Sequence, residues 1–166
     1  MPVKFNADEV FAMAEKIEQN GAAFYRKAAG MFKDEGTLDF LTRLAEMEDE
    51  HKRIFEQMRS TLEPTDKAET AYDPYDEAAL YLEEMADTHG GEGSPDVAAS
   101  LTGNESKEDV LQTAMGLEKK SILFYIGIKG LVPEKMGQEK IDHIIDEERS
   151  HVATLAREIK KVRQGG

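Results

Sequence analysis

The sequence predicts an all-α protein, an antiparallel four-helix bundle with one long crossover between its second and third helices. Two observations support this prediction. Apolar residues recur at helical spacing in four segments, and the second pair of segments repeats the pattern of the first pair one hundred positions later. Short turns join the helices within each pair and so make them antiparallel neighbours, whereas a long segment separates the two pairs.

The first helix is expected to follow Asn6 and to end at about residue 33. Asn6 and Glu9 have the spacing of a capping pair, in which each side chain accepts a hydrogen bond from the backbone N–H of the other residue. After this helix, Gly36 suits a helix end and Thr37 suits the N-cap of the next helix. Because the turn is short, the second helix should pack back along the first.

The second helix is expected over about 38–59, where apolar residues recur in steps of three and four. Residues 60–105 contain three of the five prolines and a glycine-rich stretch, a composition that is typical of a connection. One short helix, over about 75–88, is expected within this crossover. We interpret this segment as a long crossover with its own short helix and not as a separate domain, so we predict a single domain over 1–166.

The third helix is expected to follow Ser106 and to run to about Gly130. Ser106 and Asp109 repeat the capping pair of the first helix one hundred positions later. Gly130 and Pro133 then end the helix, since glycine favours helix ends and proline cannot continue one. The fourth helix is expected over about 138–163, again with apolar residues in steps of three and four.

Six polar residues interrupt the apolar stripes of these helices at one level. Four of them belong to two Glu-x-x-His stretches, whose spacing places both side chains on one helix face. A further glutamate precedes each stretch by thirty residues. The six residues are Glu18, Glu48, His51, Glu118, Glu148 and His151.

Four carboxylates in an apolar interior would repel each other and take up protons unless cations lie between them. No Lys or Arg lies on the stripes near that level, so two divalent ions are expected to balance the charge. Carboxylate and imidazole donors suit iron, manganese or zinc, and the sequence has no Cys to form a thiolate site. Tyr25 and Tyr125 either hydrogen-bond a ligand carboxylate across the bundle or serve as core aromatics.

The net charge and the distribution of apolar residues argue against nucleic-acid and membrane partners. The chain has 166 residues and a net charge of −13, which disfavours binding to nucleic acid or to an anionic membrane. The N-terminal segment has no signal-peptide apolar run, and no apolar stretch is long enough to cross a bilayer. We therefore expect a cytoplasmic protein without nucleic-acid or membrane partners.

With these residues, the chain resembles the ferritin-like di-iron superfamily, and within it the rubrerythrin-like branch. The resemblance covers nearly the whole chain and is most specific at 18–25, 48–51, 117–125 and 144–151. In that superfamily, one Glu from each of two helices and a Glu-x-x-His from each of the others hold two iron ions. The resemblance implies that Glu48 and Glu148 bridge or chelate the ions. It also implies that His51 and His151 bind one ion each and that Glu18 and Glu118 are terminal ligands.

The resemblance also implies an activity. Rubrerythrins reduce hydrogen peroxide with electrons that arrive through a rubredoxin-type iron centre. The sequence has no Cys and so no rubredoxin domain, which makes a separate protein the expected electron donor. The chain departs from rubrerythrins on the third helix, where Ser121 stands in the position of their additional glutamate.

Three functions remain open at this point. The leading expectation is a di-iron oxidoreductase that acts on hydrogen peroxide or dioxygen, as a peroxidase or a ferroxidase. The second is a non-catalytic protein that binds and buffers iron. The third is a structural bundle or interaction module whose interior carboxylates are protonated. The long crossover is also compatible with a homodimer in which two chains exchange hairpins.

Overall fold

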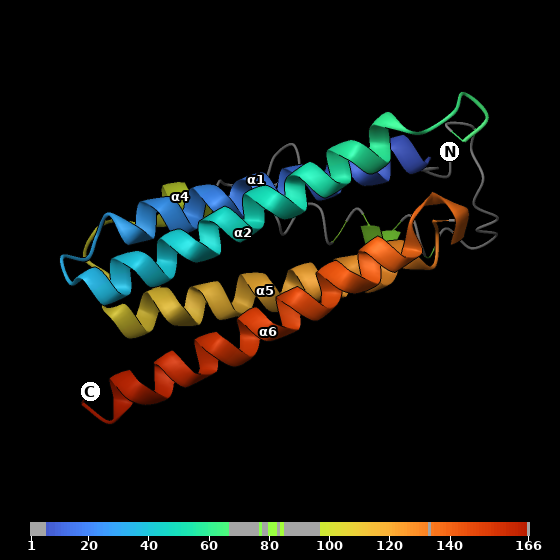
Figure 1. The fold of residues 1–166 in the computed structure, drawn as a ribbon. Helices are drawn as coiled ribbons and strands as arrows, with labels where there is room; N and C mark the ends of the chain where they lie inside the picture. The colour runs from blue at the N-terminus through green and yellow to red at the C-terminus, as the bar shows by residue number, and fades with distance from the viewer. Residues whose placement is uncertain are drawn as a thin grey trace.

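The computed structural model describes residues 6–66, 77, 80–82, 84, 97–132 and 134–165. Within these residues the bundle consists of α1 (Ala7–Ala29), α2 (Glu35–Ser60), α5 (Lys107–Lys129) and α6 (Gln138–Arg163). Two short pieces, α4 (Val97–Ser100) and the 3-10 helix η1 (Glu134–Met136), lie before and after α5 in the chain. None of the helices in this described part has the length and apolar character needed to cross a membrane. The predicted all-α bundle is confirmed (Figure 1).

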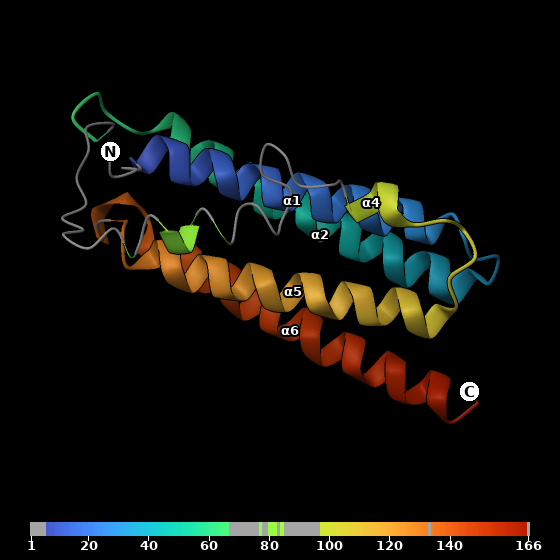
Figure 2. The same cartoon turned by 180° about the vertical axis from the view of Figure 1, so that it is seen from behind.

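The long helices pack as two hairpins, α1 with α2 and α5 with α6 (Figures 1 and 2). The hairpins face each other so that α1 lies beside α5 and α2 lies beside α6. α2 and α5 run in the same direction, and α1 and α6 run in the opposite direction, so each facing pair is antiparallel (Figure 1). α2 ends at one end of the bundle, and α5 begins at the other. The chain between α2 and α5 therefore connects opposite ends of the bundle, as the predicted crossover requires.

Capping pairs begin both hairpins, as the sequence predicts. The Asn6 side chain accepts the Glu9 N–H at 2.9 Å, and the Glu9 carboxylate accepts the Asn6 N–H at 3.0 Å. Ser106 and Asp109 make the same exchange at 3.1 and 3.2 Å. Each pair satisfies backbone N–H groups that have no partner within the helix, so the start of each hairpin is fixed locally.

The predicted turn between α1 and α2 was wrong in detail. α1 ends at Ala29, before residue 33, because the N–H groups of Met31 and Phe32 bond to carbonyls three residues back rather than four. α2 begins at Glu35, and its N-cap is Asp34 rather than Thr37. The Asp34 carboxylate accepts the Thr37 N–H at 2.9 Å, so Gly36 and Thr37 lie in the first turn of the helix.

The predicted short helix over 75–88 falls largely outside the described residues. Its described members, 77, 80–82 and 84, are helical. Further along the chain, α4 packs on α1 (Figure 2). The Lys27 ammonium donates a hydrogen bond to the Ala98 carbonyl at 2.7 Å and so attaches α4 to the first hairpin.

Two apolar clusters fill the bundle and leave a polar level between them. Each cluster takes buried residues from all four long helices, with Phe11 and Phe55 in one and Phe24 and Leu111 in the other. These four side chains are fully buried. Along α1, Glu18 lies between the two clusters. The polar level is therefore closed by hydrocarbon at both ends, which strengthens electrostatic interactions within it.

Candidate metal centre

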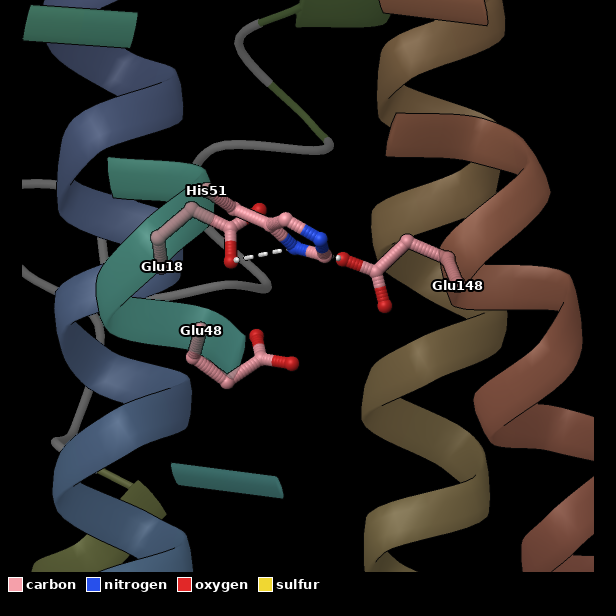
Figure 3. A group of neighbouring side chains, drawn as sticks. All are labelled: Glu18, Glu48, His51 and Glu148. Carbon is pink, nitrogen blue, oxygen red and sulfur yellow. Dashed lines mark hydrogen bonds and ion pairs between the residues drawn. The ribbon is translucent and has the colours of Figure 1, made fainter. Parts of the chain in front are cut away.

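The six polar residues predicted at one level lie together in the interior. Glu48 and His51 are one turn apart on α2 and point between the hairpins (Figure 3). Glu18 of α1 lies beside them, and Glu148 of α6 points toward them from the facing hairpin (Figure 3). The six residues have between 0% and 4% of their surface exposed, and they are Glu18, Glu48, His51, Glu118, Glu148 and His151.

These residues form two overlapping groups of potential metal ligands. In each group, one nitrogen or oxygen atom per residue lies within 4.8 Å of the corresponding atoms of the others. Both groups contain Glu48 and Glu148. The first group adds Glu18 and His51, and the second adds Glu118 and His151. Two carboxylates shared between two sets of donors are suited to hold two cations side by side.

Both imidazoles turn the same nitrogen toward the carboxylates. His51 Nδ1 lies 3.0 Å from a Glu148 oxygen and 3.5 Å from a Glu18 oxygen (Figure 3). His151 Nδ1 lies 3.2 Å from the other Glu148 oxygen and 3.4 Å from a Glu48 oxygen. The two rings are nearly parallel, with centroids 5.8 Å apart. Nδ1 is thus the histidine atom placed to bind a cation in each group.

Burial raises the pKa of three of the four glutamates in the cluster. Burial and the nearby Glu148 carboxylate raise the pKa of Glu18. Burial raises the pKa of Glu48 well above its usual value, with further contributions from the neighbouring carboxylates. The pKa of Glu148 is raised well above its usual value for the same two reasons. Negative charge at this level therefore needs positive charge beside it.

When no metal is bound, protonated histidines supply that positive charge. Burial alone would lower the pKa of His51, but hydrogen bonds and charge from Glu148 and Glu18 outweigh it and raise the pKa to about 12. The pKa of His151 rises to about 12 against the effect of burial, through its carboxylate neighbours. Burial would raise the pKa of Glu118, but its hydrogen bonds outweigh this effect and lower it. A divalent ion would have to displace such protons in order to bind.

The donor set fits metal ions. Among the buried residues in the described part of the chain there is no Lys or Arg. Four buried side-chain polar atoms have no hydrogen-bond partner within that part, and three of them belong to this cluster, namely Glu18 Oε2, Glu48 Oε1 and His151 Nε2. Two of the three are carboxylate oxygens, which divalent cations would satisfy. Oxygen and imidazole donors without thiolate suit iron, manganese or zinc.

Two tyrosines connect the hairpins at this level. The Tyr25 hydroxyl of α1 donates a hydrogen bond to Glu118 of α5, and the Tyr125 hydroxyl of α5 donates one to Glu18 of α1. Burial and the nearby carboxylates raise the pKa of both tyrosines well above its usual value. Both hydroxyls therefore stay protonated and can position one carboxylate of each ligand group.

A glycine makes room for one of the shared carboxylates. A Cβ atom at Gly21 of α1 would lie only 2.8 Å from Glu48 Oε2. A small cavity of about 10 Å³ lies at the same place, roughly the space that one water-sized guest needs. Its walls include Gly21, Glu48, Glu118 and Ser121. The cavity thus brings α1 and α5 residues together beside both ligand groups.

Replacing Gly21 by alanine is expected to weaken metal binding without unfolding the protein. The added methyl group would push the Glu48 carboxylate aside, for which we expect a loss of affinity of about tenfold or more. Helix stability should rise by up to about 1 kcal/mol, because alanine favours a helix over glycine. Calorimetric titration with Zn²⁺ and urea unfolding would measure the two effects.

Gly116→Ala is the matched control for this experiment. Gly116 lies within α5, and a Cβ atom there would meet nothing within 4 Å. The control should gain helix stability and keep its metal affinity. Equal metal affinities for Gly21→Ala and Gly116→Ala would show that the space beside Glu48 is unimportant.

Sequence reasoning missed one residue of this cluster. His51 Nδ1 faces the carboxylates of the ligand group, and His51 Nε2, on the other side of the ring, lies 2.8 Å from a Glu147 oxygen. The available signal was a glutamate directly before Glu148 in the second Glu-x-x-His stretch. The exposed His143 lies 3.5 Å from the other Glu147 oxygen.

Comparisons with known proteins identify the family and the fold. The family model described as a ferritin-like domain matches residues 6–161. A crystal structure from Thermotoga maritima, described provisionally as a ferritin-like diiron-carboxylate protein, has a similar fold, with a TM-score of 0.72. The two sequences are 20% identical, and the match covers 98% of this chain and 99% of the other. No curated protein sequence matches the chain.

Proposed function

Because the chain belongs to the family of ferritin-like domains, we propose that it is a di-iron carboxylate oxidoreductase of the rubrerythrin-like kind. Its substrate would be hydrogen peroxide or dioxygen. The observation that supports this proposal is the pair of buried ligand groups that share Glu48 and Glu148. The similar Thermotoga maritima protein carries the description diiron-carboxylate, in line with iron as the metal.

Each residue of the cluster has a part in this proposal. Two ferrous ions would supply the two electrons that, with two protons, convert one hydrogen peroxide into two waters. Glu48 and Glu148 would hold both ions, and the other four residues would complete one ligand group each. Tyr25 and Tyr125 would keep the terminal carboxylates in place through their hydrogen bonds. Manganese would fit the same donors, whereas zinc would bind without redox chemistry.

The electrons would come from a separate protein. The sequence has no Cys, so it holds no thiolate-bound iron centre of its own. A peroxidase cycle therefore needs an external donor that reduces the ions after each turnover. The apolar clusters on both sides of the site leave small molecules as the oxidants that could reach it.

The first test of this function is rapid mixing of the ferrous protein with oxidant. Anaerobically purified protein, loaded with two equivalents of Fe²⁺, is mixed with hydrogen peroxide or dioxygen in a stopped-flow spectrometer. We expect the bound iron to be oxidised faster than the same concentration of free Fe²⁺. Rates no faster than those of the free ion would rule out the oxidoreductase.

Iron buffering is the second candidate. The net charge of −13 and the lack of Cys for a thiolate-bound iron centre are compatible with a protein that only stores cations. Repeated additions of peroxide in the presence of a chemical reductant distinguish the two functions. An oxidoreductase should consume peroxide through many cycles, whereas a buffer should bind iron and show no sustained consumption.

A further inference from the structure

The two ligand groups differ in the hydrogen bonding of the histidine Nε2 atom, which is the ring nitrogen that does not face the shared carboxylates. His51 Nε2 is bonded to Glu147 of α6 at 2.8 Å. His151 Nε2 is buried and has no hydrogen-bond partner within the described residues. The residue one hundred positions before Glu147 is Met47, which lies partly buried on α2. The two halves of the sequence therefore match at the histidines but differ at the residue that could support each ring.

A carboxylate behind a histidine changes how well that histidine binds metal. Glu147 accepts the Nε2–H of His51, which fixes the ring orientation, so that Nδ1, once it has given up its proton, would be free to bind a cation among the carboxylates. A thioether is only a weak acceptor, so Met47 offers His151 no equivalent support. An N–H left without a partner in the interior is itself unfavourable.

Glu147 is well placed to give this support. Its side chain is one-third exposed, with 33% of its surface accessible, so it remains in contact with water. Its second oxygen lies 3.5 Å from His143 Nε2 on the surface of α6. Contacts at both oxygens hold the carboxylate against the His51 ring.

We infer that the two metal positions are inequivalent, and that the position formed by Glu18, Glu48, His51 and Glu148 binds a divalent cation first. Glu147 is the positioning residue responsible for the difference. The inference rests on the proposed metal centre but goes beyond it, because two equivalent ions would serve that proposal equally well. Outer hydrogen bonds of this kind typically change metal affinity by about 10- to 100-fold, and we expect the two positions to differ by a factor in that range.

Cobalt binding to the unaltered protein tests this order directly. Crystals grown with one equivalent of Co²⁺ should show strong anomalous scattering beside His51 and weak scattering beside His151. Calorimetric titration with Co²⁺ should resolve two steps. Equal occupancies together with a single affinity would overturn the inference and leave the proposed centre standing. The absence of Co²⁺ from both positions would instead overturn the proposed centre itself.

Substitutions at Glu147 and Met47 show whether the hydrogen bond is the cause. Glu147→Met should weaken the first binding step about 10- to 100-fold and leave the second unchanged. Glu147→Gln, which retains an acceptor oxygen, should recover part of the loss. Met47→Glu should strengthen the second step, and the exchange of both residues should move the first ion to His151.

Asp146→Asn is the matched control. Asp146 adjoins Glu147 on α6, but its carboxylate is bonded to Arg149 on the protein surface, at 3.2 Å. The control removes the same charge without altering the hydrogen bond to His51. If Asp146→Asn weakens the first step as much as Glu147→Met does, or if Glu147→Met weakens both steps equally, Glu147 is not a positioning residue.

Discussion

Replacing Glu48 and Glu148 together by glutamine is expected to abolish binding of both metal ions. Each ligand group would have two of its three carboxylates replaced by neutral amides, because these two residues belong to both groups. Glutamine has the size of glutamate, so the packing between the apolar clusters should be kept. Elemental analysis after loading with Fe²⁺ and dialysis under argon would give the number of ions that each chain retains.

The control for this variant removes two exposed glutamates from the same helices. Glu50→Gln with Glu139→Gln lowers the charge of α2 and α6 equally without touching the buried cluster. It should retain the full metal content. A Glu48→Gln, Glu148→Gln protein that still holds two ions would contradict the ligand assignment. Unaltered protein that binds no metal would favour the third function, a bundle with protonated carboxylates.

The metal-free protein is expected to become less stable as the pH rises from about 6 to 9. The pKa values of Glu48 and Glu148 are raised well above 4.5, and those of His51 and His151 are raised from 6.5 to about 12. The folded state therefore holds more protons than the unfolded state in this range, and each additional proton lowers the free energy of unfolding by about 1.4 kcal/mol per pH unit. The lowered pKa of Glu118 has little effect here, because this group is ionised in both states.

Bound metal should remove this pH dependence. The ions take the place of the protons, so the loaded protein should be about equally stable across the range, and its metal affinity should rise with pH. Urea unfolding with a chelator or with excess Zn²⁺, repeated at several pH values, measures both behaviours. Exposed carboxylates are ionised in both states above about pH 6, so the slope reports the interior groups. Metal-free protein that gains stability with rising pH would contradict the predicted proton uptake.

The arrangement of the six polar residues could be predicted because it depends on regular helical geometry. A spacing of three brings Glu48 and His51 to one face of α2, and the repeat after one hundred positions brings Glu148 and His151 to the matching level of α6. Burial then follows from the apolar residues on either side. The number and direction of the helices are set by the same periodicity and by the lengths of the connections.

Details that depend on a single contact could not be predicted in this way. Asp34 and Thr37 are both acceptable N-caps by residue type, and the hydrogen bond between them selects Asp34. The close approach of Gly21 to Glu48 depends on the distance between α1 and α2, which periodicity does not give. The bond from Glu147 to His51 joins the two hairpins and requires their relative rotation to be known.

The reciprocal hydrogen bonds of the tyrosines have an evolutionary consequence. Tyr25 donates a hydrogen bond to Glu118 and Tyr125 donates one to Glu18, so each hairpin donates one such bond to the other and accepts one from it. One ancestral hairpin that bore a tyrosine, two glutamates and a histidine would have formed the same centre by pairing with its own copy. After gene duplication and fusion the two halves would be able to diverge, and the difference between Met47 and Glu147 is of the kind that such divergence would produce.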